Sequence, residues 1–252
     1  MSHFTVAVFH DEFADLDAIL EPYCECTENP EYQEFEVVRS GEELHKEWKE
    51  EHPEIATIEE YAEYCGYEYD PELDAIGYVC NPNSRWDWFQ IGGRWSGLLK
   101  LKPGCEGERG ARSWCNSDEE DVPGTCDSAR LCDVDLSLDQ EAYDKAIRFW
   151  EIIVEKLPLN EGEKAPLTFL KPEYYIAQFG TKENYARQQA EFSTYAFITP
   201  DGEWHETGRM GWWGIDDATA ESRKEYRTNL AKTIEELKDN PDIWITIVDC
   251  HI

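Results

Sequence analysis

Two runs of apolar, mostly β-branched residues stand near the two ends of the chain. The first is FTVAVF at residues 4–9, and the second is IWITIVDC at residues 243–250. Successive side chains of a strand point to opposite faces, so a continuous apolar run predicts a strand that is buried on both faces. We therefore expect these two strands to be neighbours at the centre of one sheet.

The segments between these strands alternate between helical and extended patterns. Apolar residues at three- and four-residue steps predict helices, and short aromatic or β-branched runs bounded by turn residues predict strands. The Pro-Asp-Gly sequence at 200–202 predicts a hairpin turn, and Asp11 is the expected N-cap of a first helix that carries Phe13 on its apolar face. The predicted helices span residues 11–21, 41–51, 54–64, 138–157, 181–191 and 217–238, and the predicted strands span residues 35–40, 76–80, 86–91, 96–101, 193–198 and 203–206.

These elements predict an α+β protein in which residues 1–252 form a single domain. We expect a mixed, mostly antiparallel sheet with the first and last strands central and helices packed on it. An acidic helical part falls at about 41–66, and a long Gly-, Ser- and Asp-rich loop with four cysteines falls at about 103–135. A loop of that length is uncommon unless it is functional or disordered.

The composition is that of a folded, non-membrane protein. Hydrophobic residues make up 41% and aromatic residues 13% of the chain, which is too much apolar surface for a disordered protein. No apolar run approaches the roughly 20 residues of a membrane span, and the first residues lack the basic and apolar regions of a signal peptide. We therefore expect a cytoplasmic protein whose nine cysteines remain thiols.

The charge of the chain is strongly negative and unevenly distributed. Fifty-five acidic residues against 23 basic residues give a net charge of −32. Residues 1–75 carry 23 acids and 3 bases, whereas residues 76–115 carry 3 acids and 6 bases together with four tryptophans. Such a protein repels nucleic acid and anionic membranes and favours basic partners. The short basic island predicts a site for an anionic, ring-bearing ligand, although plain counter-charge for an acidic fold is the alternative.

The first group of candidate ligand-binding residues lies in the segment NPNSRWDWFQIGGRW. It comprises Arg85, Trp86, Asp87, Trp88, Arg94 and Trp95. If residues 86–91 are extended, Asp87 shares a face with a phenylalanine, so its carboxylate needs a partner such as Arg94 or Arg85. Gly92 and Gly93 permit positive φ or a close approach of the backbone to a ligand. A core tryptophan cluster with a structural Asp–Arg pair is the alternative.

The second group combines further arginines with the aromatic segment GRMGWWG. It comprises Arg130, Arg209, Trp212 and Trp213. Arginine binds phosphate or carboxylate through two parallel hydrogen bonds and also stacks on rings. In a shared pocket, Arg94, Arg130 and Arg209 would engage a phosphate, while Trp86 or Trp88, and Trp212 or Trp213, would stack on a base. The two segments are equally compatible with two halves of one core.

Catalytic candidates are weak. Asp87, Asp249 and His251 are possible acid–base residues, and Asp249 and His251 share a face of the last strand, whereas Cys250 and His251 point to opposite faces. Asp133 and Asp135 could hold Mg²⁺, although solvated charge is the default for an acidic loop. The four loop cysteines lack the CxxC spacing of zinc sites, so we expect no metal and no cofactor.

The ordered segments MSHFTV, NPNSRWDWFQIGGRW, DSARLCDVD, FSTYAFITPDGEWHETGRMGWWG and TIVDCHI together resemble a family of uncharacterised proteins found widely in tailed phages and in bacteria. The resemblance spans the whole chain. Members often read ARKGDID where this chain has ARLCDVD at residues 129–135, which makes Cys132 incidental. The resemblance implies a single full-length unit and a phage setting, with the host cytoplasm as its location. By analogy, a small phage protein of this kind is a counter-defence factor.

Three functions follow as hypotheses. The lead is a non-enzymatic protein that binds an anionic small molecule of the nucleotide class and sequesters an immune signal. The second is an acidic mimic of nucleic acid that inhibits a basic host protein. The third is a nucleotide-processing enzyme. No hypothesis involves direct binding to nucleic acid or a membrane, and assembly into a homo-oligomer is an open option.

Overall fold

The computed structural model describes residues 2–118, 120–211 and 214–252. Its helices and mixed sheets confirm the α+β class. The chain divides into two compact units, which we describe one at a time: unit 1 comprises residues 1–13 and 89–250, and unit 2 comprises residues 14–88 and 251–252. The expected organisation as one domain stays a prediction.

Unit 1 is built on a mixed sheet whose strand order is β11-β10-β1-β12-β5-β7, with β9 pairing beside β12. Strand β10 runs parallel to β1, whereas β10 and β11 form the antiparallel hairpin predicted around Pro-Asp-Gly. A further antiparallel pair joins β6 and β8. The strands are β1 (His3–Asp11), β5 (Trp88–Gly93), β6 (Leu99–Lys100), β7 (Ala111–Arg112), β8 (Thr125–Cys126), β9 (Ser128–Arg130), β10 (Ala196–Ile198), β11 (Trp204–Glu206) and β12 (Ile243–His251).

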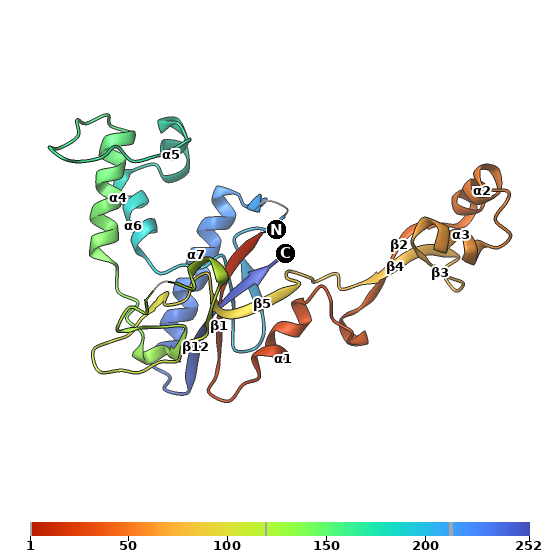
Figure 1. Cartoon of the computed structure of the whole chain (residues 1–252), viewed down its shortest axis with the longest axis horizontal. Helices are drawn as coiled ribbons and strands as arrows, with labels where there is room; N and C mark the ends of the chain where they lie inside the picture. Colours follow the sequence, from red (N-terminus) through yellow and green to blue (C-terminus); the bar gives the residue numbers. More distant parts are fainter. Residues whose placement is uncertain (1, 119, 212–213) are drawn as a thin grey trace. The chain divides into compact units, whose positions relative to one another are not determined.

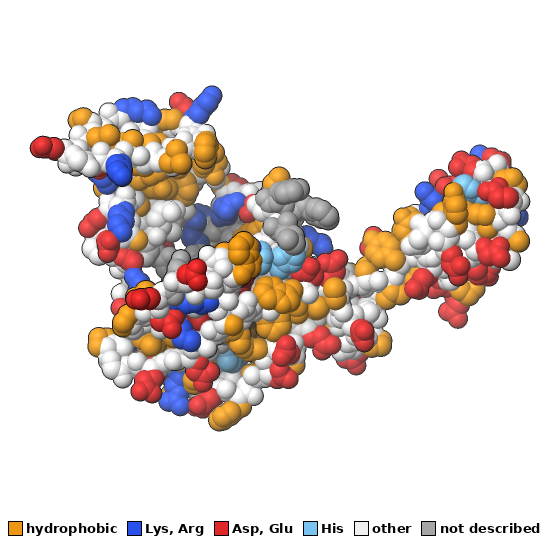
Figure 2. Space-filling model, in the orientation of Figure 1, with side chains coloured by type: hydrophobic (Ala, Val, Ile, Leu, Met, Phe, Trp, Pro, Cys, Tyr) orange, Lys and Arg blue, Asp and Glu red, His pale blue; other side chains and the backbone are white. Residues whose placement is uncertain are grey.

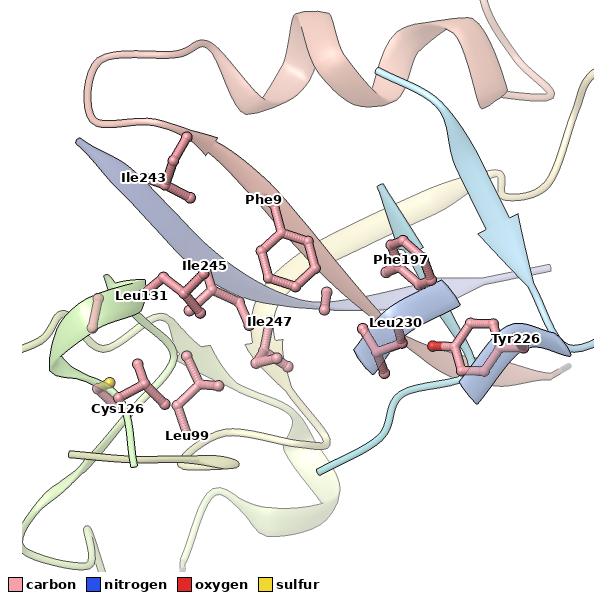
Figure 3. Packing of buried hydrophobic residues seen from close by; sticks show 13 residues of the cluster. Phe9, Leu99, Cys126, Leu131, Phe197, Tyr226, Leu230, Ile243, Ile245 and Ile247 are labelled. Carbon is pink, nitrogen blue, oxygen red and sulfur yellow. The ribbon is translucent and has the colours of Figure 1, made fainter. Parts of the chain in front are cut away.

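Strands β1 and β12 are adjacent at the centre of this sheet, as the apolar runs predict (Figure 1). Both strands are buried along nearly their whole length. Their side chains form the main core with β10 and helix α7: Phe9, Phe197, Ile247 and Leu230 belong to one buried cluster, which Figure 3 shows. The apolar runs therefore mark strands that cannot be exposed on either face without a large loss of hydrophobic stabilisation.

The helices of unit 1 are α4 (Gln140–Ile153), α5 (Pro172–Phe179), α6 (Lys182–Ala190) and α7 (Ala220–Leu237). Helix α7 packs on the sheet, whereas α4, α5 and α6 share a separate aromatic cluster that includes Trp150, Tyr175 and Tyr185. The sequence pattern predicts α4, α6 and α7 but misses α5. Pro172 occupies the first turn of α5, where a proline is tolerated because its missing N–H has no intrahelical partner.

Unit 2 contains the acidic segment of the chain. Strands β2 (Glu34–Ser40), β4 (Ala75–Cys80) and β3 (Glu68–Asp70) form an antiparallel sheet in that order. Helices α1 (Leu16–Leu20), α2 (Gly41–Glu51) and α3 (Ile58–Cys65) complete the unit. A small core around Leu44, Tyr61 and Ile76 joins α2 and α3 to the sheet. Figure 2 shows acidic side chains spread over this unit.

The start of the first helix differs from the prediction. Asp11 is the last residue of β1, and the helix begins at Leu16 with Asp15 as its N-cap, which accepts a hydrogen bond from the Asp17 backbone N–H at 3.1 Å. Phe13 is exposed instead of packed. The central strand extends two residues further than its apolar run, because pairing with its neighbours continues through the polar residues His10 and Asp11.

The loop at 103–135 is ordered around short elements. It contains β7, β8 and β9 and two 3₁₀ turns, Trp114–Asn116 and Leu131–Asp133. All nine cysteines of the chain are free thiols. Within the described ranges, none of the helices combines the length and the apolar composition needed to cross a bilayer.

Candidate functional site

The end of β5 and the turn that follows it have a backbone conformation that requires glycine. Gly92 and Gly93 have φ of +77° and +54°, the left-handed region that favours glycine. A Cβ at Gly92 would lie 2.5 Å from Oδ2 of Asp127, and a Cβ at Gly93 would lie 2.4 Å from Cβ of Asp249. The Gly-Gly pair therefore serves the packing of two aspartates against the backbone, as well as the turn.

Asp127 is fully buried and holds the second half of this turn. Its Oδ2 accepts hydrogen bonds from the Ser96 hydroxyl and the Gly110 backbone N–H, both at 2.9 Å. Its Oδ1 accepts a further hydrogen bond from the Gly97 backbone N–H. Three donors thus compensate one buried carboxylate, which would otherwise carry a large desolvation cost.

Asp249 is also fully buried and holds the first half of the turn. Its Oδ2 accepts a hydrogen bond from the Arg94 backbone N–H at 2.9 Å, and its Oδ1 accepts one from Nδ1 of His3 at 2.7 Å. A carboxylate oxygen can only accept, so the Nδ1 proton of His3 is committed to Asp249. Since one carboxylate binds both groups, the His3 ring and the Arg94 backbone are neighbours.

This arrangement presents Arg94 to solvent on a fixed backbone. The Arg94 side chain is exposed, and within the described part of the chain its guanidinium makes no hydrogen bond or ion pair. Asn116 fixes the backbone from the other side, because its Nδ2 donates to the carbonyl oxygens of Gly93 at 3.2 Å and Arg94 at 3.4 Å. The Oδ1 atom of Asn116 is buried and has no hydrogen-bond partner among the described residues. We call Arg94, His3, Asp249 and Asn116 the Arg94 site.

Asp87 and Asp249 have partners other than the arginine and the His251 ring that the sequence predicts for them. Asp87, in unit 2, accepts a hydrogen bond from Nδ1 of His251 at 2.6 Å, and its backbone N–H donates to the His251 carbonyl at 3.0 Å. Asp87 therefore obtains the partner that its environment requires, but from a histidine distant in sequence instead of Arg85 or Arg94. The expected Asp249–His251 pair is replaced by two separate Asp–His pairs, because Asp249 binds His3.

The tryptophans of the first group have three different environments. Trp86 precedes β5 and is a buried core residue of unit 2, where its Nε1 donates to the Leu20 carbonyl at 3.2 Å. The strand predicted at 86–91 begins at Trp88, so Trp86 is held by a bridge to Cys24 and not by the sheet. Trp88 is 48% exposed, and Trp95 packs against the main core of unit 1. Trp212 and Trp213 lie outside the described residues.

The remaining predicted arginines make contacts of their own. Arg130 forms an exposed ion pair with Glu12 at 3.4 Å and lies opposite Trp244 of β12. Asp249, which binds Arg94, is five residues further along β12, or about 16 Å at the usual rise of a strand. Arg209 is exposed, and its backbone N–H donates to Asp217 at 2.7 Å. Arg85, in unit 2, donates to the backbone carbonyls of residues 83 and 84.

The acidic and thiol groups of the long loop make local hydrogen bonds. Asp133 accepts one from Sγ of Cys105 at 3.3 Å, and this contact raises the pKa of the Cys105 thiol. Asp135 caps the turn at Ser137.

Burial raises the pKa of the Cys250 thiol, in β12, well above its ordinary value, which disfavours the nucleophilic thiolate. Within the described ranges, no group of three or more metal-ligating side chains is placed to hold a cation.

Sequence reasoning missed His3 and Asn116 of the Arg94 site, and it missed the buried Asp127 that holds the same turn. Of these three residues, only Asp127 lies in one of the segments singled out in the sequence, Asp-Ser-Ala-Arg. Its carboxylate could not be distinguished there from the solvated charges of an acidic loop.

Comparison with known proteins adds no relative. No family model, curated protein or solved structure matches the chain.

Proposed function

We propose that unit 1 binds an anionic, ring-bearing small molecule of the nucleotide class at the Arg94 site. The observation that supports this most directly is the single buried carboxylate of Asp249, which holds both the Arg94 backbone and the His3 ring. It leaves an arginine whose guanidinium has no hydrogen-bond or ion-pair partner among the described residues, on a backbone that two buried aspartates hold in place. Such a side chain is available to form two parallel hydrogen bonds with a phosphate.

The Arg94 guanidinium is exposed and makes no ion pair among the described residues, although the chain has 55 acidic residues. Fixing the loop before the ligand arrives reduces the entropy lost on binding, because only the side chain has to be ordered. A charged hydrogen bond contributes about 1.5–3 kcal/mol, so loss of the Arg94 guanidinium is expected to weaken binding by roughly 10- to 150-fold.

The test is analysis of small molecules retained by the purified protein. Wild-type protein, Arg94→Ala and Arg94→Lys are heat-denatured, and the released molecules are identified by mass spectrometry. We expect retention by the wild type only, because the ammonium of lysine cannot reproduce a two-pronged contact. Arg39→Ala, in unit 2, makes the same charge change and is the matched control. Equal retention by Arg94→Ala, with an unchanged melting temperature, would contradict the proposal.

In the phage setting that the sequence resemblance implies, such a protein acts as a sponge for an immune signalling nucleotide. Sequestration without chemistry predicts that the retained molecule is recovered unchanged and in a fixed ratio to protein. It also predicts that a retained nucleotide is protected from added phosphatase until the protein is denatured.

A second candidate function is acid–base chemistry on the same class of ligand, which the His3–Asp249 pair favours. Nδ1 of His3 binds the Asp249 carboxylate, and a histidine oriented by a carboxylate is an arrangement used in general acid–base catalysis. Incubation of nucleotides with wild type and His3→Gln separates the two functions. Turnover that disappears in His3→Gln supports an enzyme, whereas unchanged nucleotide in both supports sequestration.

A further inference from the structure

Unit 1 contains a second hollow that is separate in its residues from the Arg94 site. It has a volume of about 380 Å³ and lies between α5, α6 and the first turns of α7. Figure 2 shows basic side chains within the hollow beneath helices α4 to α6. The volume is within the range of small-molecule sites. Its charged and ring-bearing lining residues are Arg223, Arg227, Tyr174, Phe179, Tyr195 and Tyr226.

The two arginines lie on successive turns of α7 and bring like charges into the hollow. Nη1 of Arg227 donates to the amide oxygen of Gln188 at 2.7 Å, and within the described residues the guanidinium forms no ion pair with a carboxylate. Arg223 is paired with Asp216 at 2.9 Å. Partial burial lowers the pKa of Arg227, because desolvation disfavours the charged form. The Glu191 carboxylate attracts the Arg227 guanidinium and opposes this shift without forming an ion pair, so the one polar group that the guanidinium contacts among the described residues is the neutral amide of Gln188.

The rest of the lining is suited to a planar ring. Tyr226 is buried, with its hydroxyl group 2.9 Å from Oγ1 of Thr194, and this contact orients the ring beside the hollow. Phe179 and Tyr174, from α5, add two further rings to the lining. The side-chain amides of Gln188 and Gln189 add donors and acceptors that can form hydrogen bonds with the edge of a heterocycle.

We propose that this hollow binds a small heteroaromatic molecule that carries one anionic group, a phosphate or a carboxylate. Arg227 binds the anion, with Arg223 adding attraction from the neighbouring turn, and the tyrosine and phenylalanine rings hold the planar part. The proposal does not depend on binding at the Arg94 site, because no residue of the turn at 92–97 lines the hollow.

The test is isothermal titration of the full-length protein with four probes: adenosine monophosphate, nicotinate, adenosine and inorganic phosphate. The first two combine a ring with a phosphate or a carboxylate, and the last two supply the ring or the anion alone. We expect binding of at least one ring-bearing anion and much weaker binding of adenosine and phosphate. Arg227→Met is expected to weaken that binding about tenfold or more, whereas the charge-matched control Arg39→Ala, in unit 2, leaves it unchanged.

Melting temperatures distinguish a ligand site from a structural contact. Removal of a partly buried, unpaired charge relieves desolvation, so Arg227→Met is expected to melt at the same temperature as the wild type or higher. A lower melting temperature, together with unchanged binding, would show that the Arg227–Gln188 contact serves only to join α6 to α7. The proposal is overturned by that result, by the absence of millimolar binding of both ring-bearing anions, or by loss of binding in Arg94→Ala but not in Arg227→Met.

Discussion

Replacement of Asp127 by asparagine is a sharp test of the buried framework beneath Arg94. The carboxylate accepts hydrogen bonds on both oxygens, from Gly97 N–H on one and from Gly110 N–H and Ser96 on the other. An asparagine keeps an oxygen on one side only, so its NH₂ group must face at least one backbone N–H. We therefore expect Asp127→Asn to lose stability even though its shape is nearly unchanged.

The magnitude follows from the contacts. An unsatisfied buried donor costs about 1–3 kcal/mol, and the remaining hydrogen bonds weaken because they no longer involve a charged acceptor. Relief of carboxylate desolvation offsets part of this loss, which leaves an expected decrease of about 2–4 kcal/mol in the free energy of unfolding. For a domain of 150–250 residues this corresponds to roughly 4–16 °C in melting temperature.

Asp249→Asn is the matched control. Asp249 is equally buried, but one of its donors is the His3 ring, which can change tautomer and accept a hydrogen bond from the new amide. Its remaining oxygen still accepts from Arg94 N–H, so we expect a loss of only about 0.5–1.5 kcal/mol. Urea denaturation followed by circular dichroism measures both variants. The reasoning fails if Asp127→Asn is as stable as the wild type, or if Asp249→Asn is destabilised to the same extent.

Three further perturbations test other parts of the structure. Gly93→Ala is expected to be destabilised by about 1–3 kcal/mol or more in the same urea assay, because a Cβ at this position is disfavoured by positive φ and would clash with Asp249. Stability equal to that of the wild type would contradict this geometry. Burial lowers the pKa of His10, so the neutral ring stabilises the fold above about pH 6.5, and this contribution is lost as the pH falls through the lowered pKa. His10→Gln is expected to remove that part of the acid dependence of stability. A pH profile of stability identical to that of the wild type would refute this reasoning. Charge reversal at Glu59, Glu60 and Glu63 is expected to leave ligand retention intact, because these residues are exposed on α3 in unit 2. Loss of retention would favour the hypothesis that the protein mimics the charge of nucleic acid.

Local patterns predicted the elements whose conformation is determined by their own residues. The runs at 4–9 and 243–250 identified β1 and β12 as central strands, because no other arrangement buries both of their faces. Pro-Asp-Gly predicted the β10–β11 hairpin, since Pro200 suits the second turn position and Gly202 adopts φ of +86°. The Gly92-Gly93 pair indicated positive φ, which both glycines adopt. In each case the responsible residues are neighbours in the chain.

The partners of the charged groups depend instead on tertiary structure. Asp87, Asp127 and Asp249 are each buried or partly buried, and each needs a donor, but their sequence neighbours do not supply it. His3 is 246 residues from Asp249, and His251 is 164 residues from Asp87. A carboxylate requires a donor without specifying which one, so only the packing of the strands selects it. For the same reason the position of Arg94 was visible in the sequence, whereas the buried aspartates that hold its backbone became visible only in the folded chain.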